Sequence, residues 1–343
     1  NKLSGAEITA IIGGDLTCDW TDTDWSAQTS IGWKTAYDTG LEVMPLIDTS
    51  NVTYFSRAFR DCTALTTVPK FDLSSCSIFT DPFYGCTALK TVPSFDINNG
   101  LITNLAAFYT GCSGLETAPW MDTSNIEEFG SMYYGCSSLQ TVPTLNTDKA
   151  TNMGHMYRGC AMLTTVPPMN TSNVTGMTRM FYGCTALTSI PWMDMSNVIN
   201  ASGIFYACTS LTELPLLDFS KVWQYNSAWN GCTSLTSFPL IDTSSATELG
   251  NAWLNCSSLT SFPLIDTGLV TGFGFAWNGC SSLTSFPLIN TSSGTTLYQT
   301  WRYCSGLTSF PLIDTSSATS LTYAWGNCTG LTSFPLLDTG NVT

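Results

Sequence analysis

The chain has 343 residues, of which 43% are hydrophobic and only 10% are charged, and its formal net charge at pH 7 is −14. It contains eleven Lys and Arg residues with no basic run, so we expect no nucleic-acid partner and no adhesion to anionic membranes by charge. No stretch of about 18 apolar residues occurs, and the sequence therefore predicts no membrane insertion.

Residues 1–33 are non-repetitive and include Trp20, Trp25 and Trp33. We expect them to form an N-terminal cap. From residue 34 to residue 343 the sequence repeats, and marker residues divide this stretch into about 13 units. A stacked array needs capped ends to stay soluble. The last unit has no polar cap, which predicts a repeat solenoid truncated at its C-terminal end, or covered there by something else.

The repeat is defined by cysteines that are 24 residues apart, except for one gap of 26. Each is followed by Leu at the third residue and Pro at the seventh. A strict period of this length is typical of a solenoid in which one structural unit is stacked many times. The marker cysteines are Cys62, Cys86, Cys112, Cys136, Cys160, Cys184, Cys208, Cys232, Cys256, Cys280, Cys304 and Cys328.

Within one unit, Met177, Met180, Phe181 and Cys184 have the spacing of the apolar face of a short helix. A Gly precedes many of the cysteines and would suit a helix end. The segment around the repeat Pro is too short for a helix, so we expect it to be extended. The fold class predicted is α/β, with one short extended segment and one short helix per 24-residue coil.

The string MFYGCTALTSIPWMDMSNV and its relatives resemble the BspA-like leucine-rich repeat family, especially the subgroup of bacterial surface lipoproteins and viral 24-residue repeats. The resemblance covers residues 34–343. It implies a right-handed leucine-rich-repeat-like solenoid, and a role in surface adhesion or host recognition. It implies no catalytic residues. The late units depart from the pattern, because Trp replaces the Phe or Tyr of the early units.

The cysteines and a row of aspartates could bind metals, but simpler interpretations are favoured. Single cysteines 24 residues apart lack zinc-site spacing, so we expect buried free thiols. Cys76 occupies a core slot, while Cys18 is unassigned. The aspartates are replaced by Asn in three units, as expected for caps that accept from a backbone N–H two residues on. We therefore predict no metal, no cofactor and no catalytic residue.

The position after the repeat Pro is the most suggestive surface feature. It is Lys70, Ser94 and Thr144 in early units, which indicates a solvent-facing slot, whereas the following position is always apolar. A continuous exposed apolar row is typical of an interaction surface. The alternative is that the late coils rotate and bury this residue. We name this row the post-proline stripe: Trp120, Trp192, Leu216, Leu240, Leu264, Leu288, Leu312 and Leu336.

Together these patterns favour a protein that is not an enzyme. We predict an extracellular, cell-surface or virion-surface adhesion module that presents an elongated repeat surface to a protein or glycan receptor on a host or neighbouring cell. The alternative is an architectural coat, fibre or filament subunit that assembles through its solenoid ends or its apolar stripe. That alternative would make the chain part of a homo-oligomer or of a larger parent assembly.

Overall fold

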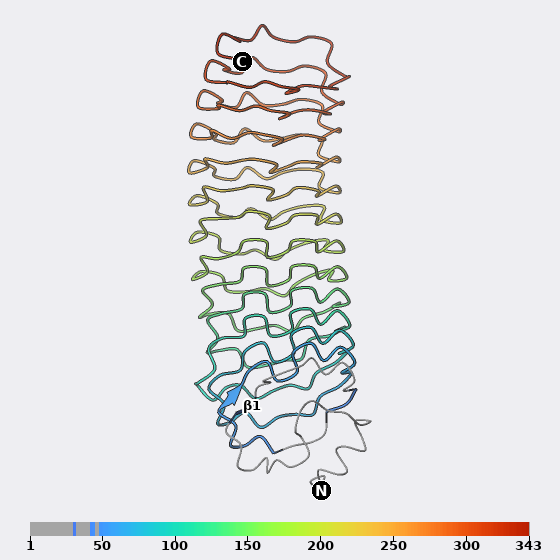
Figure 1. The fold of residues 1–343 in the computed structure, drawn as a ribbon. Coiled ribbons are helices and arrows are strands. Elements are labelled where there is room, and N and C mark those ends of the chain that lie inside the picture. Colours follow the sequence, from blue (N-terminus) through green and yellow to red (C-terminus); the bar gives the residue numbers. More distant parts are fainter. Residues whose placement is uncertain (1–29, 32–41, 45–47, 343) are drawn as a thin grey trace. The chain divides into compact units, whose positions relative to one another are not determined.

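The computed structural model describes residues 30–31, 42–44 and 48–342. The predicted cap at residues 1–33 therefore lies outside the described residues, apart from two positions, and its boundary stays a prediction. The chain divides into two compact units, Asn1–Asn173 and Val174–Thr343. The described part of each unit consists of successive coils of the 24-residue repeat, which run from blue to green in the first unit and from green to red in the second (Figure 1).

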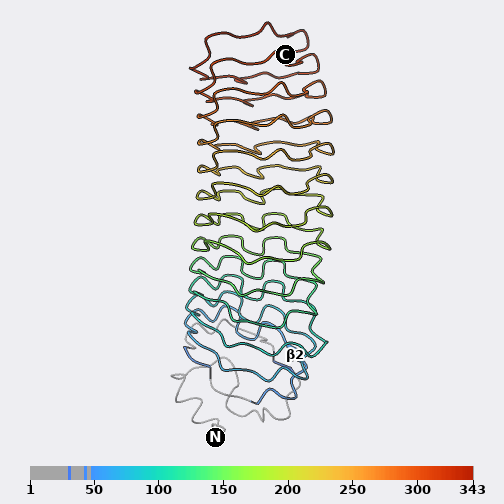
Figure 2. The same cartoon turned by 180° about the vertical axis from the view of Figure 1, so that it is seen from behind.

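The named strands are short and occur in the first unit. Strand β1 (Ser30–Ile31) pairs in parallel with β2 (Tyr54–Phe55), and the register matches Ser30 with Tyr54, one repeat later. Elsewhere, single-residue parallel bridges connect coil to coil, such as Glu248 with Gly272. The coils of each unit therefore stack in register without extended strands (Figure 2).

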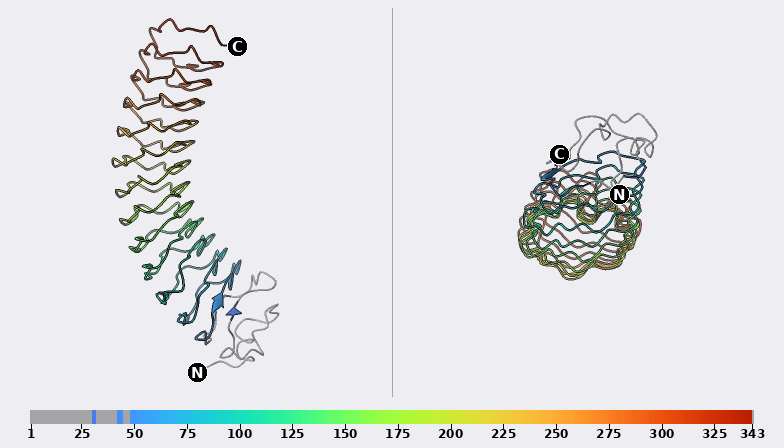
Figure 3. Two further views of the ribbon diagram at one scale, coloured as in Figure 1. Left: turned by 90° about the vertical axis from the view of Figure 1, so that its left-hand side faces the viewer. Right: turned by 90° about the horizontal axis from the view of Figure 1, so that it is seen from below.

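Backbone hydrogen bonds tie each coil to the next through alternate residues. In the second unit, Leu249 N donates to Gly272 O at 3.0 Å, and Asn251 N donates to Gly274 O at 2.9 Å. Trp253 N continues the series by donating to Ala276 O at 2.8 Å. Each donor lies 23 residues before its acceptor, so the repeat length itself sets the register. The side view of the red and orange coils shows this regular stacking (Figure 3).

The predicted short helix is not formed, and this corrects the sequence interpretation. The described residues contain no helix; consecutive turns take its place. Met132 N donates to Phe129 O and Cys136 N donates to Tyr133 O, each three residues back. Ser131 (φ 59°) and Gly135 (φ 75°) are left-handed, and such residues end a right-handed helix while completing a tight turn. These two turns, four residues apart, reproduce the apolar spacing of a helix.

The predicted extended segment has few bridges, and Pro accounts for this. Pro lacks a backbone N–H and cannot donate to a ladder. In the second unit the segment is tied to its neighbour at its start, where Thr260 N donates to Thr236 O at 3.2 Å. The rest of the segment is held by burial of Phe238 and Ile241, which point into the coil.

The core of each unit is built from stacked columns of equivalent side chains. In the second unit, Trp253 lies parallel to Trp229 and Trp277, with ring centroids 5.3 and 5.2 Å apart. Phe238 and Phe262 pack edge-on against Trp253. Aromatic rings favour these offset-stacked and edge-to-face geometries, so successive coils interlock through one repeated contact.

The cysteines form a second column, and they do more than fill space. Every described cysteine is free and buried, which confirms the predicted buried thiols and the core position of Cys76. Cys256 Sγ donates to Trp229 O at 3.2 Å, and Cys280 Sγ donates to Trp253 O at the same distance. The thiol is thus a hydrogen-bond donor to the preceding coil, which composition and spacing did not indicate. Cys18 lies outside the described residues.

Candidate functional site

The post-proline stripe lies on the surface of the described structure. In the second unit Trp192 is 63% exposed and Leu240 is 62% exposed. The alternative in which the late coils bury this leucine is therefore wrong. Exposure extends through the rest of that unit. The exposed members of the stripe in the second unit are Trp192, Leu216, Leu240, Leu264, Leu288, Leu312 and Leu336, and Trp120 is exposed in the first unit.

The extended backbone positions the stripe by alternating side chains between two faces. Leu240 points outward, Ile241 is 3% exposed, and Asp242 is exposed again. This period of two follows from the pleat of an extended chain. Pro239 fixes the backbone just before the stripe residue. The outward leucines are thus held on a backbone whose neighbouring residues are anchored in the core.

A row of carboxylates lies beside the stripe, two residues further along each coil. Asp242 Oδ1 accepts from Ser244 N at 2.9 Å, which confirms the predicted turn cap. Asn290 makes the same bond with Ser292 N at 3.0 Å, so the cap does not require a charge. The sequence interpretation missed that these residues share the outer face with the stripe. We name the aspartates of the second unit the acidic file: Asp194, Asp218, Asp242, Asp266, Asp314 and Asp338.

Hydrogen bonds from serine favour the ionised form of two members of the acidic file, Asp218 and Asp314. The Ser316 hydroxyl donates to Asp314 Oδ1 at 2.7 Å and its amide donates at 2.9 Å, and together they lower the pKa of Asp314. The hydroxyl and amide of Ser220 likewise lower the pKa of Asp218. Hydrogen bonds to a carboxylate stabilise its charged form. Asp218 and Asp314 are therefore negatively charged at neutral pH.

Buried threonines that follow the file fix its backbone. Thr267 is 1% exposed, and its hydroxyl donates to Asn290 O at 2.6 Å in the next coil. Thr291 makes the equivalent bond to Asp314 O at 2.6 Å. Each of these hydroxyls therefore ties its coil to the backbone of the Asp or Asn in the next coil. The recurring Asp-Thr-Ser string is the sequence feature from which a repeated role for this threonine could have been predicted.

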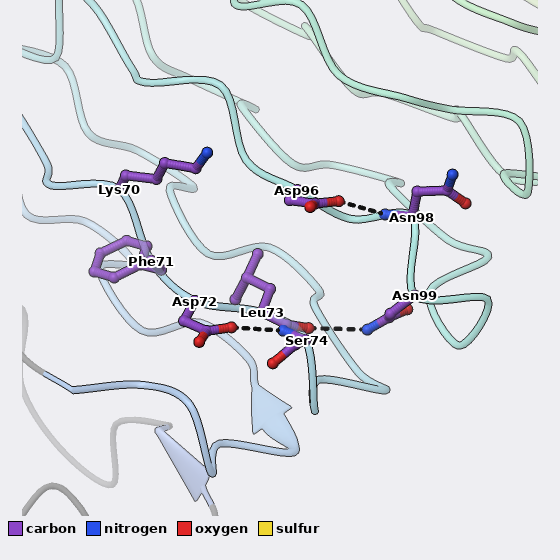
Figure 4. Close-up of a pocket in the computed structure, with 8 residues that line it drawn as sticks. All are labelled: Lys70, Phe71, Asp72, Leu73, Ser74, Asp96, Asn98 and Asn99. Carbon is purple, nitrogen blue, oxygen red and sulfur yellow. Dashed lines mark hydrogen bonds between the residues drawn. The ribbon is translucent and has the colours of Figure 1, made fainter.

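The first unit contains a hollow, which Figure 4 shows. It has a volume of about 490 Å³ and is lined by Asp72, Asp96, Asn98 and Asn99, among others. Its polar groups are already used in turns: Asp72 accepts from Ser74 N at 3.0 Å, and the Asn99 side-chain amide donates to Leu73 O at 2.9 Å. No nucleophile–base pair converges on it.

Two absences concern only the part of the chain that the structure describes. No group of three or more His, Cys, Asp or Glu side chains there could hold a metal ion. No helix there is long and apolar enough to cross a membrane.

Two family models match the chain. One, described as "Mycoplasma protein of unknown function, DUF285", matches residues 41–120 and 103–219, more than half of the chain. The other, described as "BspA type Leucine rich repeat region (6 copies)", matches residues 177–305 and 224–341. No curated protein gives a significant match.

Several solved structures are similar to the chain at low identity. A leucine-rich repeat protein from Bacteroides ovatus is 17% identical, with 85% of each chain covered and a TM-score of 0.42. A leucine rich cell surface protein from Faecalibacterium prausnitzii is 18% identical, with 82% of each chain covered and a TM-score of 0.38. A leucine rich repeat protein from T. pallidum is 18% identical, covering 63% of this chain and 76% of its own, with a TM-score of 0.27.

Proposed function

This chain belongs to the BspA-like leucine-rich-repeat family and to the Mycoplasma family of unknown function, and from that membership we propose that it is a non-catalytic binding module of the cell surface. Its fold is a leucine-rich-repeat-type solenoid. Proteins of this family are typically non-enzymatic surface proteins involved in binding. The finer assignment, adhesion to a receptor, is argued from the surface of the second unit.

The observation that carries the proposal is the exposure of the post-proline stripe. Leu216, Leu264 and Leu312 are each at least 60% exposed, although the residue that follows each of them is buried. Large contiguous apolar rows on a surface mark interaction sites, because leaving them in water is unfavourable. Covering one leucine side chain contributes about 1.5–3 kcal/mol before the costs of association. Several leucines in one row can therefore supply the affinity of a specific complex.

The proposal is tested by adhesion. Beads coated with the purified chain are applied to epithelial and bacterial cells, and retention is compared with that of beads carrying the variant Leu240→Ser/Leu264→Ser/Leu288→Ser. We expect the wild-type chain to adhere and the variant to lose most of the adhesion. Protease treatment of the cells, set against periodate treatment, distinguishes a protein receptor from a glycan receptor.

A matched control removes exposed apolar side chains from elsewhere in the same unit. Ile199 and Leu269 are 52% and 59% exposed and lie outside the stripe. The variant Ile199→Ser/Leu269→Ser should adhere like the wild-type chain. Absence of adhesion to any cell type, or equal losses in the two variants, would show that the stripe is not a receptor-binding surface.

A further inference from the structure

We infer that the post-proline stripe and the acidic file of the second unit together form a docking surface for an amphipathic α-helix. The apolar face of that helix is flanked by Lys or Arg. This inference rests on the proposed function. The partner is thus a protein segment, recognised by the period of its apolar residues and by its positive charge. Three properties of the second unit lead to this occupant: the side-by-side rows, the sign of the charge and the spacing of the coils.

The two rows lie close enough for one helix to cover both. Leu240 and Asp242 are two residues apart on an extended segment, which separates their Cα atoms by about 7 Å. An α-helix with its side chains is about 10–12 Å across. A helix lying along the leucines therefore brings the residues at the edge of its apolar face over the carboxylates.

The charge of the second unit favours a cationic partner. Its acidic residues number eight, the six of the acidic file with Glu213 and Glu248, while its basic residues are Arg179, Lys221 and Arg302, giving 3 − 8 = −5. At Asp242 and Asp266, which are exposed, the turn cap uses only Oδ1, which accepts from the backbone amide two residues on. Complementary charge across an interface selects the partner and speeds association.

The same charge argues against a second copy of this chain as the occupant. Pairing two stripes face to face would bring together two surfaces of the same negative net charge, and like charges across an interface are unfavourable. Lys221 leaves this balance negative, because only three basic residues in the unit oppose eight acidic ones. An anionic lipid surface is disfavoured for the same reason.

The coil spacing matches the pitch of an α-helix. Phe238 and Phe262, two residues before successive stripe leucines, have ring centroids 5.5 Å apart, and later pairs in this column are 5.8 to 6.0 Å apart. The tryptophan column is spaced at 5.2 to 5.9 Å. One helical turn advances about 5.4 Å, so each coil meets one turn. A β-strand repeats a face every 6.7 Å or so and would lose register sooner.

The test uses synthetic peptides as probes and the full chain as the receptor. The first peptide is a labelled helix of about six turns with Leu at the inward positions and Lys beside them. One control has the same composition in scrambled order, and another replaces Lys with Glu. Binding is measured by fluorescence anisotropy at two salt concentrations. We expect the Lys helix to bind about tenfold more tightly than either control, and less tightly at the higher salt concentration.

Two receptor variants separate the contributions of the rows. Asp242→Asn/Asp266→Asn/Asp314→Asn removes charge but keeps the turn caps, as Asn290 already does. It should weaken binding of the Lys helix about tenfold and flatten its salt dependence. Leu240→Ser/Leu264→Ser/Leu288→Ser should weaken binding at least as much, while Ile199→Ser/Leu269→Ser should not. Near-ultraviolet circular dichroism of the tryptophan column confirms that each variant is folded.

Each result decides between the hypotheses. Equal binding of the helical and scrambled peptides, or unchanged binding by the Asn variant, overturns the helix inference. If adhesion still depends on the stripe in that case, the proposed function stands without it. If the stripe variant adheres as well as the wild-type chain, the proposed function itself is overturned. Self-association in sedimentation that is lost in the Ser variant would identify a second copy of the chain as the occupant, and would overturn the helix inference.

Discussion

At the scale of single residues, the buried thiol combines two properties that are usually considered separately. Cys280 packs like a small apolar side chain and also donates to the carbonyl of the preceding coil. Burial raises the pKa of the Cys280 thiol to about 12, because the thiolate would be desolvated. Burial likewise raises the pKa of Cys76 to about 11. The thiol form is therefore maintained by the same packing that it supports.

Chemical modification tests this protection. Because the reactive species is the thiolate, the described cysteines should not react with a disulfide reagent at pH 8 in the native state, and all should react in denaturant. Cys328, in the last coil, is the least buried of the marker cysteines and should be the first to react. Cys18 lies outside the described residues and is removed by Cys18→Ser. Rapid native labelling of Cys136 or Cys256 would contradict the prediction.

Removal of one thiol should be measurable. Cys256→Ala deletes a buried sulfur and the donor to Trp229 O, and should lower the free energy of unfolding by about 1.5 kcal/mol. Urea denaturation followed by tryptophan fluorescence measures the change. Ser261→Ala is the control, because Ser261 is exposed and lies five residues after Cys256. It should leave the urea midpoint of unfolding unchanged. An unchanged midpoint for Cys256→Ala would mean that the thiol bond contributes nothing to stability.

A hydroxyl in the aromatic column is expected to be unfavourable. Tyr133 is fully buried, and its hydroxyl has no hydrogen-bond partner among the described residues. Burying an unpaired hydroxyl costs free energy, and Phe fills the equivalent position as Phe181. Tyr133→Phe should therefore raise the free energy of unfolding by about 1 kcal/mol in the same assay. A loss of stability would show that the hydroxyl has a partner.

At the scale of the structural element, the repeated unit is a pair of turns, and its left-handed residues carry the geometry. Gly135 has φ 75°, and its N–H donates to Arg158 O at 2.7 Å. A Cβ at Gly135 would meet Gly111 Cα at 3.6 Å, so space permits a side chain and the backbone angle sets the cost. Asn255 adopts the same conformation in a later coil.

This predicts an order of substitutions at one site. Gly135→Asn should cost about 1 kcal/mol of unfolding free energy, because Asn tolerates the left-handed region, whereas the β-branched Gly135→Val should cost clearly more. Thermal denaturation of both variants gives the comparison. Equal losses for Asn and Val would show that crowding, and not backbone angle, decides which residue is accepted there.

The turns also explain which features of the coil could be predicted from the sequence and which could not. The stripe was predicted because Lys70 and Thr144 occupy its slot, while core residues such as Ile241 always follow it. The caps were predicted because Asn replaces Asp in three units, and the structure shows that Asn290 makes the same bond. The helix prediction was wrong because Ser131 and His155 are left-handed without being Gly, and side-chain type gives no sign of this. The thiol bonds depend on that backbone path and could not be foreseen.

At the scale of the whole molecule, acid should weaken the fold. The Ser316 hydroxyl and amide lower the pKa of Asp314 below its ordinary 3.8, and the donors of Ser220 lower that of Asp218. A lowered folded pKa stabilises the folded state fully above the ordinary value, and this contribution is lost as pH falls through the folded value. The contribution of these two aspartates should thus be constant above about pH 5 and decline below about pH 4.

The matched variant is Asp218→Asn/Asp314→Asn, in which both caps persist without a titrating group. Its free energy of unfolding should depend less steeply on pH below about pH 4 than that of the wild-type chain. Urea titrations at a series of pH values provide the slopes. Identical slopes in the two proteins would place the acid sensitivity elsewhere.

The coil-to-coil ladder has an evolutionary consequence. Leu249, Asn251 and Trp253 each donate to a residue 23 positions ahead, so the bonding of one coil depends on its immediate neighbours. Recombination between the near-identical FPLIDT blocks that duplicates or deletes one coil would keep every remaining bond in register. Such an event would change the number of stripe leucines and file carboxylates together. Gene copies of different repeat number would then differ in the length of partner that they can hold.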